Sequence, residues 1–171
     1  MYNPAFFWRE FSMNDQHNQK LQQVISHKIA EKGGIAFADF MADCLYHPEW
    51  GYYMTDRIRV GKQGDFFTSS SVHSLFGVLI SRQIRQMWEL LGKEAFTIVE
   101  QGAGDGHLAN DILNALQAEA PDFYQDLRYC IIEISPDNRN RQKMTLAAHG
   151  DRIAWSTSEA LEPFTGCFLS N

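Results

Sequence analysis

The sequence contains few cysteines and no long apolar run. Its 171 residues include three cysteines, Cys44, Cys130 and Cys167, which lie far apart and form no Cys-x-x-Cys pair. This spacing argues against a disulfide framework and against a zinc site built on paired cysteines, and it suits a reducing compartment. No stretch approaches the roughly 20 apolar residues that a membrane-spanning helix needs. We therefore expect a cytoplasmic protein that does not insert into a membrane.

Positive charge is also scarce. Lys and Arg number 15 against 21 Asp and Glu, which gives a formal net charge of −6. Such a chain lacks the basic surface that is typical of proteins bound to duplex nucleic acid or to anionic membranes, so we expect no nucleic-acid partner. Hydrophobic residues make up 44% of the chain, enough for a buried core in about one ordinary domain.

The two ends of the chain differ from its middle. Residues 1–12 are rich in aromatics and lack the pattern of a secretory signal, so residues 1–18 are interpreted as an N-terminal extension, with Met13 as a candidate natural start. The last residues, from Gly166 to Asn171, form a short apolar run typical of a buried strand. Because nothing follows this run, we interpret the chain as truncated at a fourth strand.

Hydrophobic periodicity divides the rest into a helical part, residues 19–94, and an α/β part, residues 95–171. Apolar spacing predicts helices near 20–31, 37–45, 72–91 and 108–118, a further helix opened by Ser135-Pro136, and a loop over 119–126. Apolar runs predict strands near 96–100, 128–134, 152–155 and 166–171. Strands that alternate with helices predict a parallel sheet with right-handed crossovers.

A glycine-rich turn follows the first predicted strand. Gly102, Gly104 and Gly106 alternate in it, and Glu100 closes the strand before it. Glycines between a strand and a helix let the backbone turn sharply and approach a ligand closely. A dinucleotide fingerprint needs its third glycine at position 107, which is His107, so an NAD-dependent oxidoreductase is disfavoured. The spacing favours a nucleoside ligand without a pyrophosphate.

A second acid, Glu133, closes the second predicted strand. A carboxylate in this place can accept hydrogen bonds from both hydroxyls of a ribose. The alternative is structural, with glycines that only make a tight turn and Glu133 as an exposed strand end.

The order of acid, alternating glycines, strand and acid resembles the class I S-adenosylmethionine-dependent methyltransferases. The N-terminal half resembles the MidA-like family within them, and Gly64-Asp-Phe-Phe-Thr68 is the most specific piece of the resemblance. Further matching segments are Gly33-Gly-Ile35, Phe40-Met41, Cys44-Leu45-Tyr-His-Pro48, Gly51-Tyr-Tyr53 and Leu75-Phe-Gly77. The chain departs from the family pattern at Gln101 and at Ser69-Ser-Ser71, and it stops one residue before a glutamate that would follow Asn171 in the family motif.

This resemblance implies a partial Rossmann-like sheet of strand order 3-2-1-4, preceded by a helical region, with S-adenosyl-L-methionine as cofactor. The residues that it implies for cofactor binding are Glu100, Gly102, Gly104, Gly106, Glu133, Ile134, Ser170 and Asn171. Asp65, in the Gly-Asp-Phe loop, is the candidate catalytic carboxylate; a turn-capping role is its alternative. The family includes a mitochondrial complex I assembly factor that is a protein arginine methyltransferase, so the implied partner is a protein substrate, such as a respiratory complex subunit.

Several alternatives remain at the level of the sequence. The chain could be a catalytically incomplete protein-interaction or assembly domain that keeps the methyltransferase fold. His47, His73 and His107 have no metal-ligand spacing, so we expect no metal. In the implied sheet the fourth strand is an apolar edge, which predicts self-association through residues 167–171.

Overall fold

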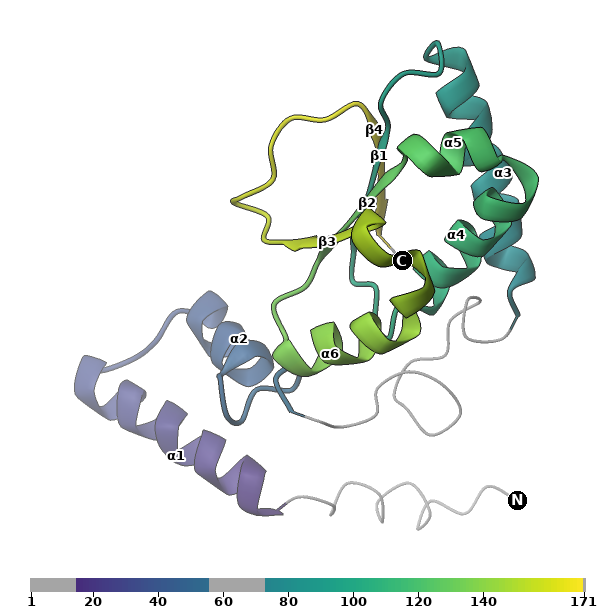
Figure 1. Cartoon of the computed structure of the whole chain (residues 1–171). Helices are drawn as coiled ribbons and strands as arrows, with labels where there is room; N and C mark the ends of the chain where they lie inside the picture. Colours follow the sequence, from purple (N-terminus) through teal and green to yellow (C-terminus); the bar gives the residue numbers. More distant parts are fainter. Residues whose placement is uncertain (1–14, 56–72, 171) are drawn as a thin grey trace, which may run out of the picture. The chain divides into compact units, whose positions relative to one another are not determined.

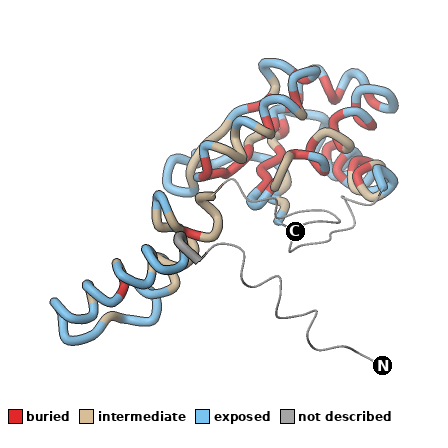
Figure 2. Tube along the Cα trace, turned by 90° about the horizontal axis from the view of Figure 1, so that it is seen from below, coloured by how far each residue is buried: buried red, intermediate tan, exposed pale blue. Residues whose placement is uncertain are grey.

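The computed structural model describes residues 15–55 and 73–170 (Figure 1). The described residues form two compact units, 15–55 and 73–170. Each unit is described by itself. Buried residues gather in the second unit, whereas the helices of the first are mostly exposed (Figure 2).

The first unit is a pair of helices, α1 (Asp15–Lys32) and α2 (Phe37–Tyr46). Gly33 and Gly34 end α1 with φ angles of 70° and 156°, which favour glycine over other residues. The ammonium of Lys28 on α1 lies 2.6 and 2.8 Å from the two carboxylate oxygens of Asp43 on α2. Both predicted helices are confirmed, with α1 beginning earlier than expected.

The first described helix of the second unit is α3 (Leu75–Leu90), which packs against α4 (His107–Glu119). A Cβ added at Gly77 would lie 2.4 Å from the Cβ of Asp111, so glycine allows the two helices to approach closely. The helix predicted from residue 72 begins at Leu75, and its expected cap at Ser69–Ser71 lies outside the described residues. Together with the sheet, α3 belongs to the second unit.

The sheet consists of β1 (Thr97–Gln101), β2 (Arg128–Ile132), β3 (Ile153–Ser156) and β4 (Gly166–Ser170). All neighbours are parallel, in the order β3-β2-β1-β4. The predicted α/β class and strand order are confirmed. At Gly166 a Cβ would lie only 1.8 Å from the carbonyl oxygen of Thr97, so glycine is needed where β4 begins its pairing with β1.

The remaining elements are α5 (Pro121–Asp126), α6 (Pro136–Thr145) and the 3-10 segment η3 (Ala147–Arg152). The expectation of a loop over residues 119–126 is wrong. Pro121 occupies the first turn of α5, and Phe123 and Tyr124 are buried, so tertiary packing stabilises a short helix there. The predicted start of α6 is confirmed, because the Ser135 hydroxyl accepts a hydrogen bond from the Asn138 N–H.

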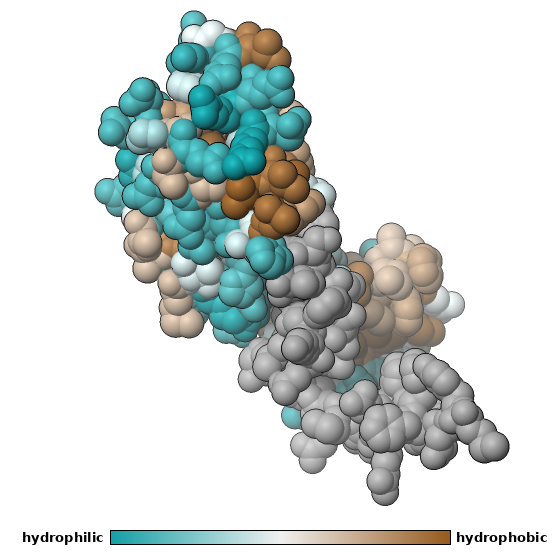
Figure 3. Space-filling model, turned by 90° about the vertical axis from the view of Figure 1, so that its right-hand side faces the viewer, coloured by the Kyte–Doolittle hydropathy of each residue, from teal (hydrophilic) through white to brown (hydrophobic). Residues whose placement is uncertain are grey.

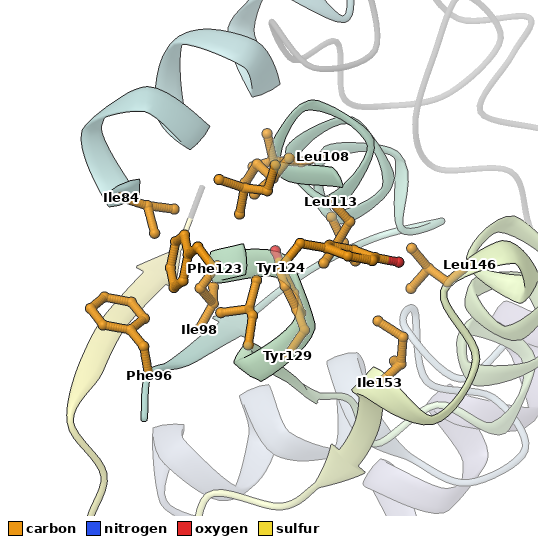
Figure 4. Close-up of a cluster of buried hydrophobic side chains, with 14 of the residues drawn as sticks. Ile84, Phe96, Ile98, Leu108, Leu113, Phe123, Tyr124, Tyr129, Leu146 and Ile153 are labelled. Atoms are coloured by element: carbon orange, nitrogen blue, oxygen red, sulfur yellow. The ribbon is translucent and has the colours of Figure 1, made fainter. Parts of the chain in front are cut away.

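The core lies between the sheet and the helices α3, α4 and α5 (Figure 4). Trp88 of α3 stacks on Phe123 of α5 with ring centroids 4.4 Å apart, and its indole N–H donates to the carbonyl of Glu94. The largest wholly buried side chains include Tyr129, Phe123, Ile84 and Ile98. This packing supports β1 and β2 from one face and fixes the position of their carboxyl ends.

The outer surface of α3 retains exposed leucines, among them Leu75, Leu79 and Leu90. Figure 3 shows hydrophobic surface on this side of the molecule, separated by hydrophilic atoms. In the part of the chain that the structure describes, no helix is both long and apolar enough to span a bilayer.

Candidate functional site

The glycine turn follows the carboxyl end of β1 and leads into α4. Gly102, Gly104 and Gly106 have φ angles of 80°, 55° and 84°, a region that other residues rarely adopt. The N–H of Gly106 donates to the carbonyl of Ala103 at 2.8 Å, and Gly106 is the N-cap residue of α4. The turn thus brings main-chain groups and a helix N-terminus to the edge of the sheet without side chains on its three glycines.

Glu100 lies on β1 with its side chain buried among core residues. The Tyr129 hydroxyl donates to Glu100 Oε2 at 2.7 Å. Burial raises the pKa of Glu100 to about 7, and the hydrogen bond from Tyr129 opposes this rise. The carboxyl therefore changes its charge near neutral pH.

Glu133 comes directly after β2 and is buried, with 8% of its surface exposed. Its Oε1 accepts from the Ser135 N–H at 2.8 Å. Its Oε2 accepts from Asn138 Nδ2 at 3.0 Å and from Gln142 Nε2 at 3.2 Å. The carboxylate is therefore fixed by the first turns of α6. This observation argues against the alternative in which Glu133 is an exposed strand end.

The helix α6 also contacts the glycine turn. Gln142 Nε2 donates to the Gly104 carbonyl at 2.8 Å, and Arg141 Nε donates to Asp105 Oδ1 at 2.7 Å. A Cβ at Gly106 would contact the Leu146 side chain at 3.4 Å. As Figure 1 shows, α6 follows the carboxyl end of β2. One helix therefore links the turn after β1 to the acid after β2.

Two further predicted residues lie at the same edge of the sheet. Ile134 follows Glu133 and is 51% exposed. Its side chain is therefore accessible as an apolar surface on which a flat ring could pack. Ser170 ends β4 opposite Gln101 of β1. The structure thus brings Glu100, the three glycines, Glu133, Ile134 and Ser170 to the carboxyl ends of neighbouring parallel strands. Asp65 and Asn171, in contrast, lie outside the described residues.

Residues that sequence reasoning missed are Gln142, Asn138 and Arg141, all on α6. Asn138 and Gln142 are four positions apart and so share one face of the helix, which is the available signal. Because α6 is polar on all sides, the sequence does not show which face turns inward. Within residues 15–55 and 73–170, no group of three or more His, Cys, Asp or Glu is arranged to hold a metal ion.

Comparison with protein families adds to this geometry. The model of a family described as putative S-adenosyl-L-methionine-dependent methyltransferases matches residues 79–171, more than half of the chain. The chain belongs to this family. The matched segment includes most of α3, the glycine turn, Glu133, α6 and all four strands.

The relatives of this methyltransferase-family chain are longer proteins. The mitochondrial protein arginine methyltransferase NDUFAF7 homolog of Drosophila melanogaster is 35% identical over 119 residues, which are 68% of this chain and 26% of that protein. NDUFAF7 of Homo sapiens is 32% identical over 149 residues, which are 82% of this chain and 34% of that protein. The chain therefore spans about a quarter to a third of the length of these relatives.

A solved structure resembles this family member over most of its length. It is a methyltransferase-superfamily protein of Burkholderia thailandensis crystallised with S-adenosyl-homocysteine, and it is 29% identical with a TM-score of 0.76. The match covers 91% of this chain and 41% of the other. A native structure of a superfamily protein from the same organism matches with a TM-score of 0.69 at 30% identity.

Proposed function

We propose that the chain binds S-adenosyl-L-methionine at the carboxyl edge of β1, β2 and β4 and forms part of a methyltransferase. The observation that carries this proposal is the pairing of two features on neighbouring parallel strands. A turn with three left-handed glycines follows β1, and a buried, fixed carboxylate follows β2. Family membership and the S-adenosyl-homocysteine in the Burkholderia protein support the same ligand.

The residues at this edge suit the parts of that cofactor. Gly102, Gly104 and Gly106 leave the backbone open to close approach, and Glu133 offers a carboxylate oxygen to a ribose hydroxyl. Ile134 would pack on the adenine, with Ser170 and Asn171 beside the donor group. Glu100, near the end of β1, supports the glycine turn or binds the amino group of the methionine part. When bound, the cofactor supplies an electrophilic methyl group on a sulfonium, and the protein mainly aligns the reactants.

We propose a protein arginine side chain as the methyl acceptor. The relatives' names, which specify protein arginine methyltransferases, support this class of substrate. A guanidinium is cationic at working pH, so its approach to a sulfonium needs nearby carboxylates that hold it and take a proton. Asp65 is the candidate for this role, and a respiratory complex subunit is the candidate substrate.

Calorimetric titration of S-adenosylhomocysteine into the purified chain tests the cofactor site. We expect micromolar binding by the wild type and its loss in Glu133→Ala. The exposed Glu94 offers a matched control, because it precedes β1, at the edge of the sheet opposite to the turn, and Glu94→Ala should keep the wild-type affinity. Absence of binding by a folded wild-type chain would contradict the proposed site.

Transfer of a labelled methyl group to an arginine-containing peptide tests the activity. We expect transfer that is lost in Glu133→Ala and reduced in Asp65→Asn. A chain that binds S-adenosylhomocysteine and transfers no methyl group would favour the other function considered above, a protein-interaction or assembly domain that retains the fold.

Two further proposals concern location and assembly. We propose a cytoplasmic protein, whereas the relatives in animals are named as mitochondrial; fractionation of source cells distinguishes the two.

We also propose self-association through β4, because β4 is an edge strand of the described sheet and its Phe168 is 49% exposed.

A further inference from the structure

We infer that Gln142 is a positioning residue, which holds the Glu133 carboxylate and the glycine turn in the geometry that a nucleoside requires. This inference rests on the proposed cofactor site. Gln142 is wholly buried, with none of its surface exposed, although it lies on a polar helix. Burial of an amide is costly unless its polar atoms are bonded, so its partners define its role.

Every polar atom of the Gln142 side chain has a partner. Its Oε1 accepts from the indole N–H of Trp155 on β3 at 2.8 Å. Its Nε2 donates to the Gly104 carbonyl at 2.8 Å and to Glu133 Oε2 at 3.2 Å. The indole can only donate, so Oε1 must face Trp155 and the NH₂ must face the other two groups. One amide therefore joins the turn after β1, the acid after β2 and the strand β3 in a single orientation.

These bonds determine which atoms of Glu133 remain available to a ligand. Within the described part of the chain, Oε2 accepts from both Asn138 and Gln142, whereas Oε1 accepts only from the main-chain N–H of Ser135. A carboxylate oxygen has about two acceptor sites, so Oε1 is the atom with room for a further donor. Gln142 thus turns the carboxylate so that Oε1 is the oxygen offered to a ribose hydroxyl.

The Gly104 contact has a parallel effect on the turn. Gly104 has a φ of 55°, and its carbonyl is held by Gln142 rather than left free to rotate. The adjacent Asp105 is held by Arg141 of the same helix. The turn is therefore set before a ligand arrives, which reduces the ordering cost of binding.

Two substitutions separate this role from simple packing. Gln142→Met keeps most of the side-chain volume and removes all three hydrogen bonds. Gln142→Glu keeps the shape but places a carboxylate against two acceptors, the Gly104 carbonyl and Glu133, unless it takes up a proton. The loss of binding affinity in Gln142→Glu should therefore depend on pH, whereas a loss caused by a packing defect would be independent of pH. Gln117 is exposed on α4 and supplies the matched controls Gln117→Met and Gln117→Glu.

The experiment is a double-mutant cycle in S-adenosylhomocysteine binding, measured by calorimetry on the full chain. The cycle combines Gln142→Met with Glu133→Gln, a change that keeps a weak acceptor and measurable affinity. We expect Gln142→Met to weaken binding about tenfold in the wild-type background, as the loss of hydrogen bonds to a charged group would. In the Glu133→Gln background we expect a clearly smaller loss. For Gln142→Glu we expect the affinity for S-adenosylhomocysteine to recover as the pH is lowered from 8 toward 5. The recovery is measured relative to the affinity of the Gln117→Glu control at the same pH.

The outcomes separate this inference from the proposed function. No binding by the wild type and by the Gln117 controls overturns both. Binding by the wild type that is unchanged in Gln142→Met overturns the inference alone. Equal losses in both backgrounds, or a Gln142→Glu defect that does not change with pH, would show that Gln142 acts by packing and would also overturn it. If Gln142→Met does not fold, the pH dependence of Gln142→Glu carries the test.

Discussion

The hydroxyl of Tyr129 donates a hydrogen bond to Oε2 of Glu100 across 2.7 Å, and both side chains are buried. Burial, followed by the nearby Glu100 charge, raises the pKa of Tyr129 well above its ordinary value, so this hydroxyl remains a donor. Burial also raises the pKa of Glu100 to about 7. A core hydrogen bond therefore connects β2 to an acid that titrates within the physiological range, directly before the glycine turn.

Glu100 should make the stability of the chain fall as pH rises. Because its folded-state pKa lies above its unfolded value, the stability that it contributes is full below about pH 4.5 and is lost as pH rises through about 7. We expect the free energy of unfolding of Glu100→Gln, relative to wild type, to increase between pH 5 and pH 8, by on the order of 3 kcal/mol at most. Urea unfolding over this range measures the effect. The control Glu159→Gln, at an exposed position, should run parallel to wild type; parallel curves for Glu100→Gln would exclude the assignment.

His149 should act in the opposite direction. It is 1% exposed, its Nδ1 lies 2.8 Å from the Tyr124 hydroxyl, and its Nε2 has no hydrogen-bond partner among the described residues. Burial, and then the charge of Arg152, lower the pKa of His149. The unfolded chain therefore binds a proton that the folded chain does not, and stability should fall as pH drops below about 6.5.

We expect His149→Gln to be less stable than wild type at pH 8 but to lose less stability between pH 7 and pH 5. Urea unfolding at several pH values checks this difference in slope. His27 is exposed on α1, so His27→Gln should keep the wild-type slope. A His149 imidazole that takes up its proton above pH 6.5 in an NMR titration would contradict the prediction.

Gly166 and Gly92 should differ in their tolerance of a methyl group. At Gly166 a Cβ would meet the Thr97 carbonyl oxygen at 1.8 Å, and backbone on both strands prevents relief. At Gly92 no atom of the described residues lies within 4 Å of such a Cβ, and its φ of 86° is what disfavours alanine. We expect Gly166→Ala to cost about 3 kcal/mol and Gly92→Ala about 1 kcal/mol in urea unfolding. Equal costs would mean that β4 does not approach β1 as described.

The proposed self-association should depend on Phe168. We expect the sedimentation coefficient of the wild type to rise with concentration, and this rise to disappear in Phe168→Lys, because a charge on an edge strand opposes pairing with another chain. Phe164 is 36% exposed but precedes β4, so Phe164→Lys should still associate. A wild-type chain that stays monomeric at high concentration would count against the prediction.

Prediction from the sequence succeeds where a periodic pattern or a glycine constrains the chain locally. The strands around Ile98 and Tyr129 are short apolar runs, and the turn between Gly102 and Gly106 is visible from spacing alone. The helix α5 escapes this reasoning because six residues carry no period, and only the burial of Phe123 and Tyr124 stabilises it. The role of Gln142 escapes it for another reason: its partners lie on three separate elements, and only the assembled sheet brings them together.

The order of the strands has a consequence for synthesis. β1, β2 and β3 leave the ribosome before β4. The edge strand β4, however, pairs with β1, which is one of the two central strands of the sheet. Until β4 emerges, the open edge of β1 and the apolar face beneath Cys167 and Leu169 have no cover from this strand. A nascent chain paused between β3 and β4 should therefore be a strong client for chaperones that bind exposed strands, and release should follow the arrival of Gly166.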